Sequence, residues 1–143
     1  MPRLGRISLL GLFLLSVGCS GGRSSMPPQD RVQGTVYFRG HALPGGMIVF
    51  VPDSERGNRG ELLTASIQSN GQFSILPAPG QPIPLGWHRV AIAPPSRSSS
   101  SESRVTLSLF ENVPDRYRSP SLSLLSCELK PGLNSMNIHL EDY

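Results

Sequence analysis

The chain has 143 residues, which is the size of one domain and enough to bury a single core. Its formal net charge is +3, and without Arg3 and Arg6 it has 11 basic residues, scattered along the chain, against 10 acidic ones. A near-neutral chain of this kind argues against nucleic acid as a partner, and its 15 glycines and 14 prolines favour short strands and tight turns over long helices.

The N-terminus has the pattern of an export signal. Arg3 and Arg6 precede an apolar run from Ile7 to Leu15. The run is much shorter than the about 20 apolar residues that a membrane-spanning helix needs. A short buried helix is the alternative, but the run has almost no polar face. We therefore predict a signal peptide over residues 1–18.

The end of this segment, Ser16-Val17-Gly18-Cys19, resembles the bacterial lipoprotein cleavage box, in which small residues precede a cysteine that becomes acylated. The usual box has leucine three residues before the cysteine, whereas Leu15 lies four before it here. The resemblance implies cleavage between Gly18 and Cys19 and attachment of acyl chains such as palmitate to Cys19. Two acyl chains give stable anchoring, since each buried methylene contributes about 0.8 kcal/mol. Ordinary secretion is the alternative.

Residues 19–30 are rich in Ser, Gly and Pro and are predicted to form a flexible tether. Ser20 stands where an aspartate would resemble an inner-membrane retention signal, so we expect the periplasmic face of the outer membrane or the cell surface. Membrane lipid is then a partner through Cys19. If Cys19 carries lipid, Cys127 has no intramolecular disulfide partner.

From Arg31 onward the chain is predicted to be all-β. Seven segments either alternate apolar and polar residues or are continuously apolar, and each is predicted to be a strand. They lie at about 32–39, 47–51, 63–68, 73–75, 86–92, 125–129 and 136–140. Asn70-Gly71 is the strongest hairpin signal, because both residues accept positive φ. Val105 to Phe110 is either a further strand or a loop that folds back on the sheet. Seven strands favour a two-sheet sandwich.

Several short motifs occur together in a characteristic order. They are Val32-x-Gly34-x-Val36, Asn70-Gly71-x-Phe73, Gly86 before Val90-x-Ile92, Pro114-x-x-Tyr117, and Pro131-Gly132-x-Asn134. In this order they resemble the carboxypeptidase regulatory-like, or transthyretin-like, β-sandwich of small bacterial lipoproteins. The resemblance implies a Greek-key-like sandwich over residues 31–143 and a mostly non-catalytic family. This sequence departs from the family at His88, where tyrosine is usual, and at Ser69, where aspartate is commoner.

Residues that would carry catalysis or bind a metal are few. His41, His88 and His139 have no close spacing such as His-x-x-x-His, so we expect no metal site. Cys127 falls on the same side of its predicted strand as Leu125 and Leu129. It is therefore predicted to be a buried apolar group rather than a nucleophile. Asp53 and Glu55, with Asn58, would hold at most a weak cation, and solvated charge is the better interpretation.

Tyr117-Arg118-Ser119 superficially resembles the C-terminal signature of hydroxyisourate hydrolases, which share the transthyretin-like fold. The signature's glycine is missing, Pro120 follows, and a further strand comes later. We expect Tyr117 to cover the end of the sandwich instead. We predict no enzyme and no cofactor.

Three residues are candidates for a binding surface. Trp87, Tyr37 and Arg89 fall on outward strand positions, and an aromatic ring beside an arginine can stack on a sugar or a peptide. The alternative for Trp87 is packing against a proline-rich loop such as Pro77 to Pro84 or Pro94-Pro95.

These observations predict a non-catalytic, lipid-anchored envelope protein that acts as a structural module or binds protein or polysaccharide through sheet edges or end loops. A small-molecule-binding module is an alternative and would need a concave, partly apolar cavity. A transthyretin-like hydrolase is another, and would need a histidine or Cys127 to meet a carboxylate in a pocket.

Overall fold

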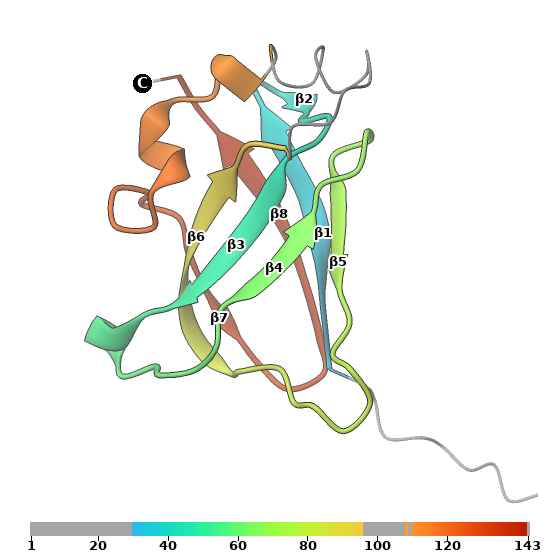
Figure 1. Ribbon diagram of the computed structural model, residues 1–143, viewed down its shortest axis with the longest axis vertical. Helices are drawn as coiled ribbons and strands as arrows, with labels where there is room; N and C mark the ends of the chain where they lie inside the picture. The colour runs from blue at the N-terminus through green and yellow to red at the C-terminus, as the bar shows by residue number, and fades with distance from the viewer. Residues whose placement is uncertain (1–29, 96–107, 109, 143) are drawn as a thin grey trace, which may run out of the picture.

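The computed structural model describes residues 30–95, 108 and 110–142 (Figure 1). These residues form eight strands and two 3₁₀ turns, in the order β1 (Arg31–Phe38), β2 (His41–Ala42), β3 (Met47–Pro52), η1 (Ser54–Arg56), β4 (Leu63–Ser66), β5 (Gln72–Ile75), β6 (Gly86–Ala93), η2 (Asp115–Arg118), β7 (Ser126–Leu129) and β8 (Leu133–Leu140). No helix among the described residues has the length and apolar character needed to cross a bilayer.

The strands make two four-stranded sheets, so the predicted two-sheet sandwich is confirmed. In sheet A, β1 is central: it pairs with β8 in parallel along its whole length, and with β5 and β2 in antiparallel fashion. Sheet B has the order β4-β3-β6-β7 and is antiparallel throughout. Figure 1 shows that the first and last strands, β1 and β8, lie side by side.

All seven predicted strands form, and the eighth is β2, which lies between the first two of them. Arg39 and Gly40 have φ values of 51° and 77°, and Phe38 pairs with His41 across them. Positive φ at both central residues is the geometry of a tight two-residue hairpin. The turn therefore ends at Gly40, and His41 and Ala42 pair with β1.

The sequence predicts a β-hairpin at Asn70-Gly71. This prediction is wrong, because the two flanking strands do not pair with each other. A turn does form there, and the N–H of Gln68 donates to the Gln72 carbonyl (2.8 Å). However, β4 before the turn pairs with β3 in sheet B, whereas β5 after it pairs with β1 in sheet A. The chain crosses between the sheets here because β1 offers a free edge and β5 can bury Phe73 and Ile75 in the core.

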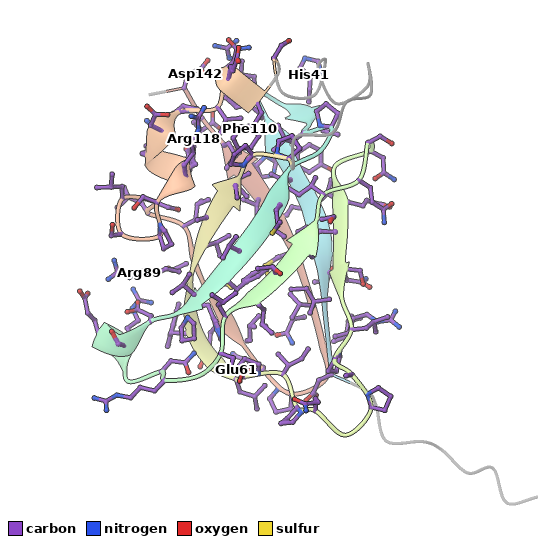
Figure 2. All side chains as sticks on the ribbon, viewed as in Figure 1. His41, Glu61, Arg89, Phe110, Arg118 and Asp142 are labelled. Carbon is purple, nitrogen blue, oxygen red and sulfur yellow. The ribbon has the colours of Figure 1, made fainter. Side chains whose placement is uncertain are left out.

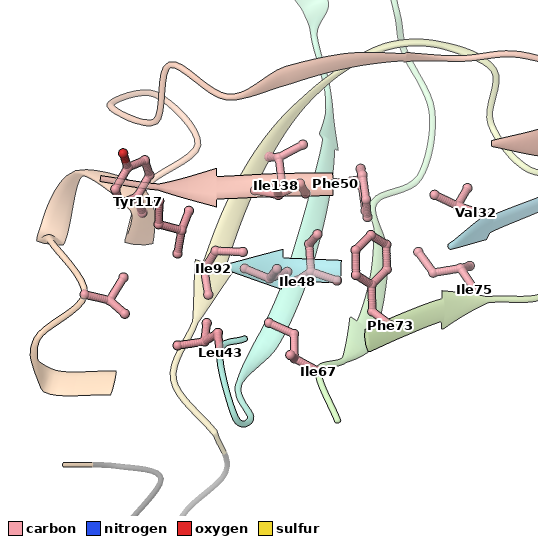
Figure 3. Packing of buried hydrophobic residues seen from close by; sticks show 14 of the residues in the cluster. Val32, Leu43, Ile48, Phe50, Ile67, Phe73, Ile75, Ile92, Tyr117 and Ile138 are labelled. Atoms are coloured by element: carbon pink, nitrogen blue, oxygen red, sulfur yellow. The ribbon is translucent and has the colours of Figure 1, made fainter. Parts of the chain in front are cut away.

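The core lies between the sheets and is built from the inward residues of each strand (Figure 3). Val36 of sheet A and Ile48, Phe50 and Ile92 of sheet B have no exposed surface. The Phe50 ring lies 6.0 Å from the Phe73 ring, centre to centre, and so joins the two sheets. Burial of this apolar surface is the main force that holds the sheets together.

One end of the sandwich is closed by the segment before β7. Phe110 is buried in a short helical turn, so the strand alternative for Val105 to Phe110 does not hold at this residue, while 105–107 and 109 lie outside the described residues. The Arg118 guanidinium lies 5.3 Å from the centre of the Phe110 ring. Buried Tyr117 accepts a hydrogen bond at its hydroxyl from the N–H of Glu141 (3.0 Å), as expected of a structural residue at the sandwich end.

The register of β8 against β1 is supported at the start of both strands. Asp30 Oδ1 accepts a hydrogen bond from the N–H of Gly132 (2.7 Å), and the N–H of Arg31 donates to the Gly132 carbonyl (3.0 Å). Asn134 Oδ1 accepts from the N–H of Lys130 (2.9 Å), which closes the turn before β8. These contacts determine which outward residues of β1 and β8 become neighbours.

Candidate functional site

The outer face of sheet A carries two rows of uncharged polar side chains. Gln33 of β1 pairs with Ser74 of β5 on one side and with Ser135 of β8 on the other. Two residues along each strand, Thr35 pairs with Gln72 and Asn137. We call these six residues the polar face. Because side chains alternate between the two sides of a strand, the polar face is the surface opposite to the core.

The polar face is hollowed. A depression of about 340 Å³ is lined by all six of its residues together with Gly34, Gln68 and Phe73. Its volume is near the lower end of the roughly 300–1,000 Å³ seen for ligand pockets. None of the lining side chains is charged, so the groups facing a ligand would be amides and hydroxyls. The central strand β1 places Gln33 and Thr35 in the middle of this surface.

An aromatic pair lies in the next row along the strands. Tyr37 of β1 pairs with His139 of β8, and their rings are 5.0 Å apart between centres and nearly parallel, at 10°. Offset stacking of this kind is a favourable geometry for aromatic rings. The pair adds two flat side chains to the end of a surface that otherwise consists of amides and hydroxyls.

One side chain of the polar face is held by a local hydrogen-bond network. Asn70 Nδ2 donates to Gln72 Oε1 (2.9 Å), while Asn70 Oδ1 accepts from the backbone N–H of Gln72 (3.0 Å). The turn thus orients the Gln72 amide before any ligand arrives. Fixing a side chain in advance lowers the entropy that binding costs.

Trp87 and Arg89, by contrast, lie on the outer side of β6 in sheet B, so the structure separates them from Tyr37. Trp87 remains 36% exposed, and the Arg56 guanidinium carbon lies 4.2 Å from the centre of its ring. Neither of the two environments predicted for Trp87 included this arginine. Asn58 Nδ2 donates to the Trp87 carbonyl (2.8 Å) and holds the loop against the strand.

Arg89 belongs to a small charged cluster beside Trp87. Its side chain forms ion pairs with Glu55 (2.5 Å) and Asp53 (3.4 Å), and Figure 2 shows it near the η1 loop. Asp53 is only 4% exposed, so its predicted solvated character is wrong. The Asp53 carboxylate instead caps η1, accepting from the N–H of Glu55 (3.1 Å), and lies 3.6 Å from Arg56 Nε. The acidic and basic side chains of this cluster pair with one another, so Arg89 already has acidic partners.

The three histidines and Cys127 are spread over both sheets. His88 and Cys127 are cross-strand partners in sheet B, while His41 and His139 are on sheet A, with His41 at the end of the sandwich near Phe110 (Figure 2). Among residues 30–95, 108 and 110–142, no three His, Cys, Asp or Glu side chains gather as metal ligands.

His88 is fully buried, whereas Cys127, predicted to be buried, is half-buried against the core. His88 has no exposed surface, and desolvation lowers its pKa below the usual 6.5, although its Nδ1 donates to the Gly86 carbonyl (2.9 Å). Burial raises the pKa of the Cys127 thiol to about 11, so it is protonated at neutral pH. A protonated thiol is a poor nucleophile.

A second depression lies at the end of the sandwich near β2. It has about 300 Å³ and is lined mainly by apolar groups, from Phe38, Arg39, His41, Ala42, Leu43, Pro44 and Asn112. This is the partly apolar cavity that a small-molecule-binding module would need.

Gly18 and Cys19, the predicted cleavage and lipidation site, lie outside the described residues. Of the three binding residues predicted from the sequence, only Tyr37 borders the polar face. The six residues of the polar face themselves were not predicted. The sequence does show polar residues at alternate positions of these three segments. Only the pairing of β5, β1 and β8 brings the six residues together on one surface.

No protein-family model matches the chain, and no curated protein matches it. Solved structures with a similar arrangement include a DUF3823 family protein from Parabacteroides merdae, at 16% identity and a TM-score of 0.46 over 80% of this chain and 47% of that one. Another is the Bacillus anthracis TIE protein, at 12% identity and a TM-score of 0.40 over 80% of this chain and 16% of that one.

A third is the dioxygenase domain of a dioxygenase carbohydrate-binding protein fusion from a Streptomyces species, at 17% identity and a TM-score of 0.34 over 84% of both chains. The chain thus spans about half of the DUF3823 protein and less than a fifth of the TIE protein. Similarities at this level neither assign the chain to a family nor transfer a function. The chain is an all-β protein whose described residues form a two-sheet sandwich.

Proposed function

We propose that this protein is an exported, lipid-anchored component of the cell envelope that acts as a non-catalytic binding module. Its binding surface is the polar face of sheet A. The observation that carries the proposal is the hollow of about 340 Å³ lined by uncharged polar side chains from three strands. Polar side chains that converge on a concave surface, one of them already oriented by Asn70, are typical of recognition sites.

The anchor is proposed from the sequence. Arg3, Arg6 and the short apolar run before Cys19 favour export, and Gly18-Cys19 favours cleavage and acylation. The acyl chains would hold the protein at the periplasmic face of the outer membrane or at the cell surface, and residues 19–30 would set its reach. Membership of the carboxypeptidase regulatory-like family is part of the same proposal and rests on the motifs of the chain.

The anchor is tested by metabolic labelling with radioactive palmitate. Label should enter the wild-type protein and fail to enter Cys19→Ala, which should also leave the membrane fraction. Cys127→Ala is the matched control, since it removes the other cysteine and should be labelled like the wild type. Equal labelling of Cys19→Ala would contradict the anchor.

The binding surface is tested separately by photo-crosslinking in cells. A photoreactive amino acid placed at Gln33 should form a covalent adduct with an envelope component, whether protein or glycan. The same amino acid at Thr64, which is exposed on β4 of sheet B, is the control. The absence of an adduct from position 33, or equal adducts from both positions, would contradict a binding role for the polar face.

A second candidate function, binding of a small apolar molecule, is favoured by the depression of about 300 Å³ near β2. A fluorescent apolar dye should bind there, and Ala42→Trp, which adds a large side chain to the lining, should reduce that binding. Dye binding that is the same in Ala42→Trp would exclude this site.

A further inference from the structure

The chemistry of the polar face matches one class of ligand, and this step rests on the proposed function. We propose that the polar face binds a neutral glycan, with the hydroxyl groups of successive sugars bonded to the side chains of β5, β1 and β8. The Tyr37–His139 pair supplies the flat contact at one end.

The side chains of the polar face are amides and hydroxyls. Gln33, Gln72 and Asn137 each present an amide with two donor hydrogens and an acceptor oxygen, while Thr35, Ser74 and Ser135 present hydroxyls. Every one of these side chains both donates and accepts. A sugar hydroxyl also donates and accepts, so the hydroxyls of a glycan and the side chains of the polar face can provide each other's hydrogen-bond partners.

The lining of the hollow carries no charged side chain. An acidic glycan or a phosphorylated ligand would lose its hydration without gaining a cationic partner there, and a cationic peptide would find no carboxylate. Two arginines flank the hollow along β1: Arg39 is paired with Asp142, and Arg31, two residues before Gln33, is exposed but does not line the hollow. The surface therefore favours a neutral ligand.

The polar face suits a glycan better than a protein partner. Protein interfaces depend on a few large anchors, mostly Trp, Tyr and Arg, that fill pockets on the partner. The two rows of the polar face contain none of these, and their side chains are short or medium in length. Only Tyr37 and His139 are large, and they stack on each other at the margin, where an apolar face of a sugar ring can pack against an aromatic ring.

The rows also extend along the strands. Successive outward residues of a strand are about 7 Å apart and neighbouring strands about 5 Å apart. Gln33, Thr35 and Tyr37 thus form a line of contacts along β1, with a parallel line of Ser135, Asn137 and His139 on β8. A repeating linear chain suits such lines of contacts.

The inference is tested by affinity electrophoresis of the full-length lipidated protein in mild detergent. Native gels contain laminarin, xyloglucan or starch as neutral polysaccharides, alginate as an acidic one, or no polysaccharide. We expect retardation by at least one neutral polysaccharide and none by alginate. The retardation should persist in 0.5 M NaCl, because no ion pair is involved.

The variants locate the binding on the polar face. Gln33→Ala combined with Asn137→Ala should raise the dissociation constant obtained from the retardation by roughly tenfold or more, since two hydrogen-bonding side chains are lost. Asn137→Asp, of nearly the same shape, should also weaken it. Thr64→Ala, an exposed polar-to-alanine change on sheet B, should bind like the wild type. Thermal unfolding of each variant shows whether the sandwich is intact.

Two results would overturn the inference: no retardation by any of the three neutral polysaccharides, or retardation that is equal in the wild type and the Gln33→Ala, Asn137→Ala variant. If retardation fails while the photoreactive residue at Gln33 captures an envelope protein, the proposed binding module stands and its ligand is a protein. If both experiments fail, the polar face is not a binding surface.

Discussion

The Arg56 guanidinium covers one side of the Trp87 ring, with 4.2 Å between the guanidinium carbon and the ring centre. Arg56 lies in η1, which is held over β6 by the buried Asp53 carboxylate and by Asn58. The two side chains come from segments about thirty residues apart, and the contact explains why an outward tryptophan is only 36% exposed. Trp87 is also the single tryptophan of the chain, so its surroundings can be measured directly.

Arg56→Ala should expose the Trp87 ring to water. We expect a red-shifted fluorescence emission and faster quenching by acrylamide, with a loss of about 1 kcal/mol or less in the free energy of unfolding, because cation–π contacts at exposed sites are weak. Arg59→Ala, which removes an exposed arginine of the same loop, is the control and should leave the emission unchanged. Identical emission from Arg56→Ala and the wild type would contradict the contact.

Cys127 should react slowly with thiol reagents in the folded protein. Burial raises the pKa of its thiol from 9.0 to about 11, so little thiolate exists at pH 8. If Cys19 is acylated as proposed, Cys127 is the only thiol in the chain, and colorimetric titration should show rapid reaction only after unfolding in urea. Rapid reaction of the folded protein at pH 8 would show that the thiol is accessible.

The same shift predicts how stability depends on alkaline pH. Between pH 9 and about 11 the unfolded chain loses the Cys127 proton while the folded chain retains it, so the free energy of unfolding should fall as the pH rises through this range. Cys127→Ala should lack this part of the fall. Urea unfolding midpoints at pH 8 and pH 10.5 for both proteins make the comparison.

His88 should make the protein less stable in mild acid. Its pKa is lowered by burial, so below pH 6.5 the unfolded chain takes up a proton that the folded chain does not. The unfolding midpoint in urea should therefore fall between pH 7.5 and pH 5. His88→Gln should show a smaller fall, whereas His41→Gln, which changes an exposed histidine, should behave like the wild type. Equal falls in all three proteins would exclude His88 as the source.

Gly34→Ala should destabilise the sandwich and loosen the polar face at the same time. A Cβ at residue 34 would lie 1.9 Å from the carbonyl oxygen of Met136 in β8 and 3.0 Å from the Phe73 ring. Backbone must shift to relieve this overlap, at a cost of about 1–3 kcal/mol. Gly57→Ala is unsuitable as a control because its φ is 79°, so Ser66→Ala on the exposed side of β4 serves instead. Thermal unfolding measures the difference.

Much of the secondary structure was predictable because side-chain alternation is a local property. Val32 and Val36 of β1 share a face in the pattern and are both fully buried in the structure, and His88, Val90 and Ile92 of β6 do likewise. The break between the predicted segments 125–129 and 136–140 likewise contains the turn at Lys130-Pro131-Gly132, between β7 and β8. These features depend on residues that are close together in the chain.

Strand pairing was harder to predict. Asn70-Gly71 has the local chemistry of a hairpin and forms a turn, yet the strands on either side join different sheets. Local turn chemistry is the same whether the chain returns beside its own strand or crosses to the opposite sheet. The outcome depends on which edge is free and on the inter-sheet packing of Phe73 against Phe50.

The sequence by itself determined seven of the eight strands and which side of each is apolar, and it predicts an export signal over residues 1–18. Only the tertiary structure decided that β1 pairs in parallel with β8, which places Gln33 and Thr35 beside Ser135 and Asn137, about a hundred residues later. It also decided that Tyr37 and Trp87 lie on different sheets. The physical reason is that alternation repeats every two residues and is encoded locally, whereas register and partner choice depend on contacts between distant segments that form only when the core is packed.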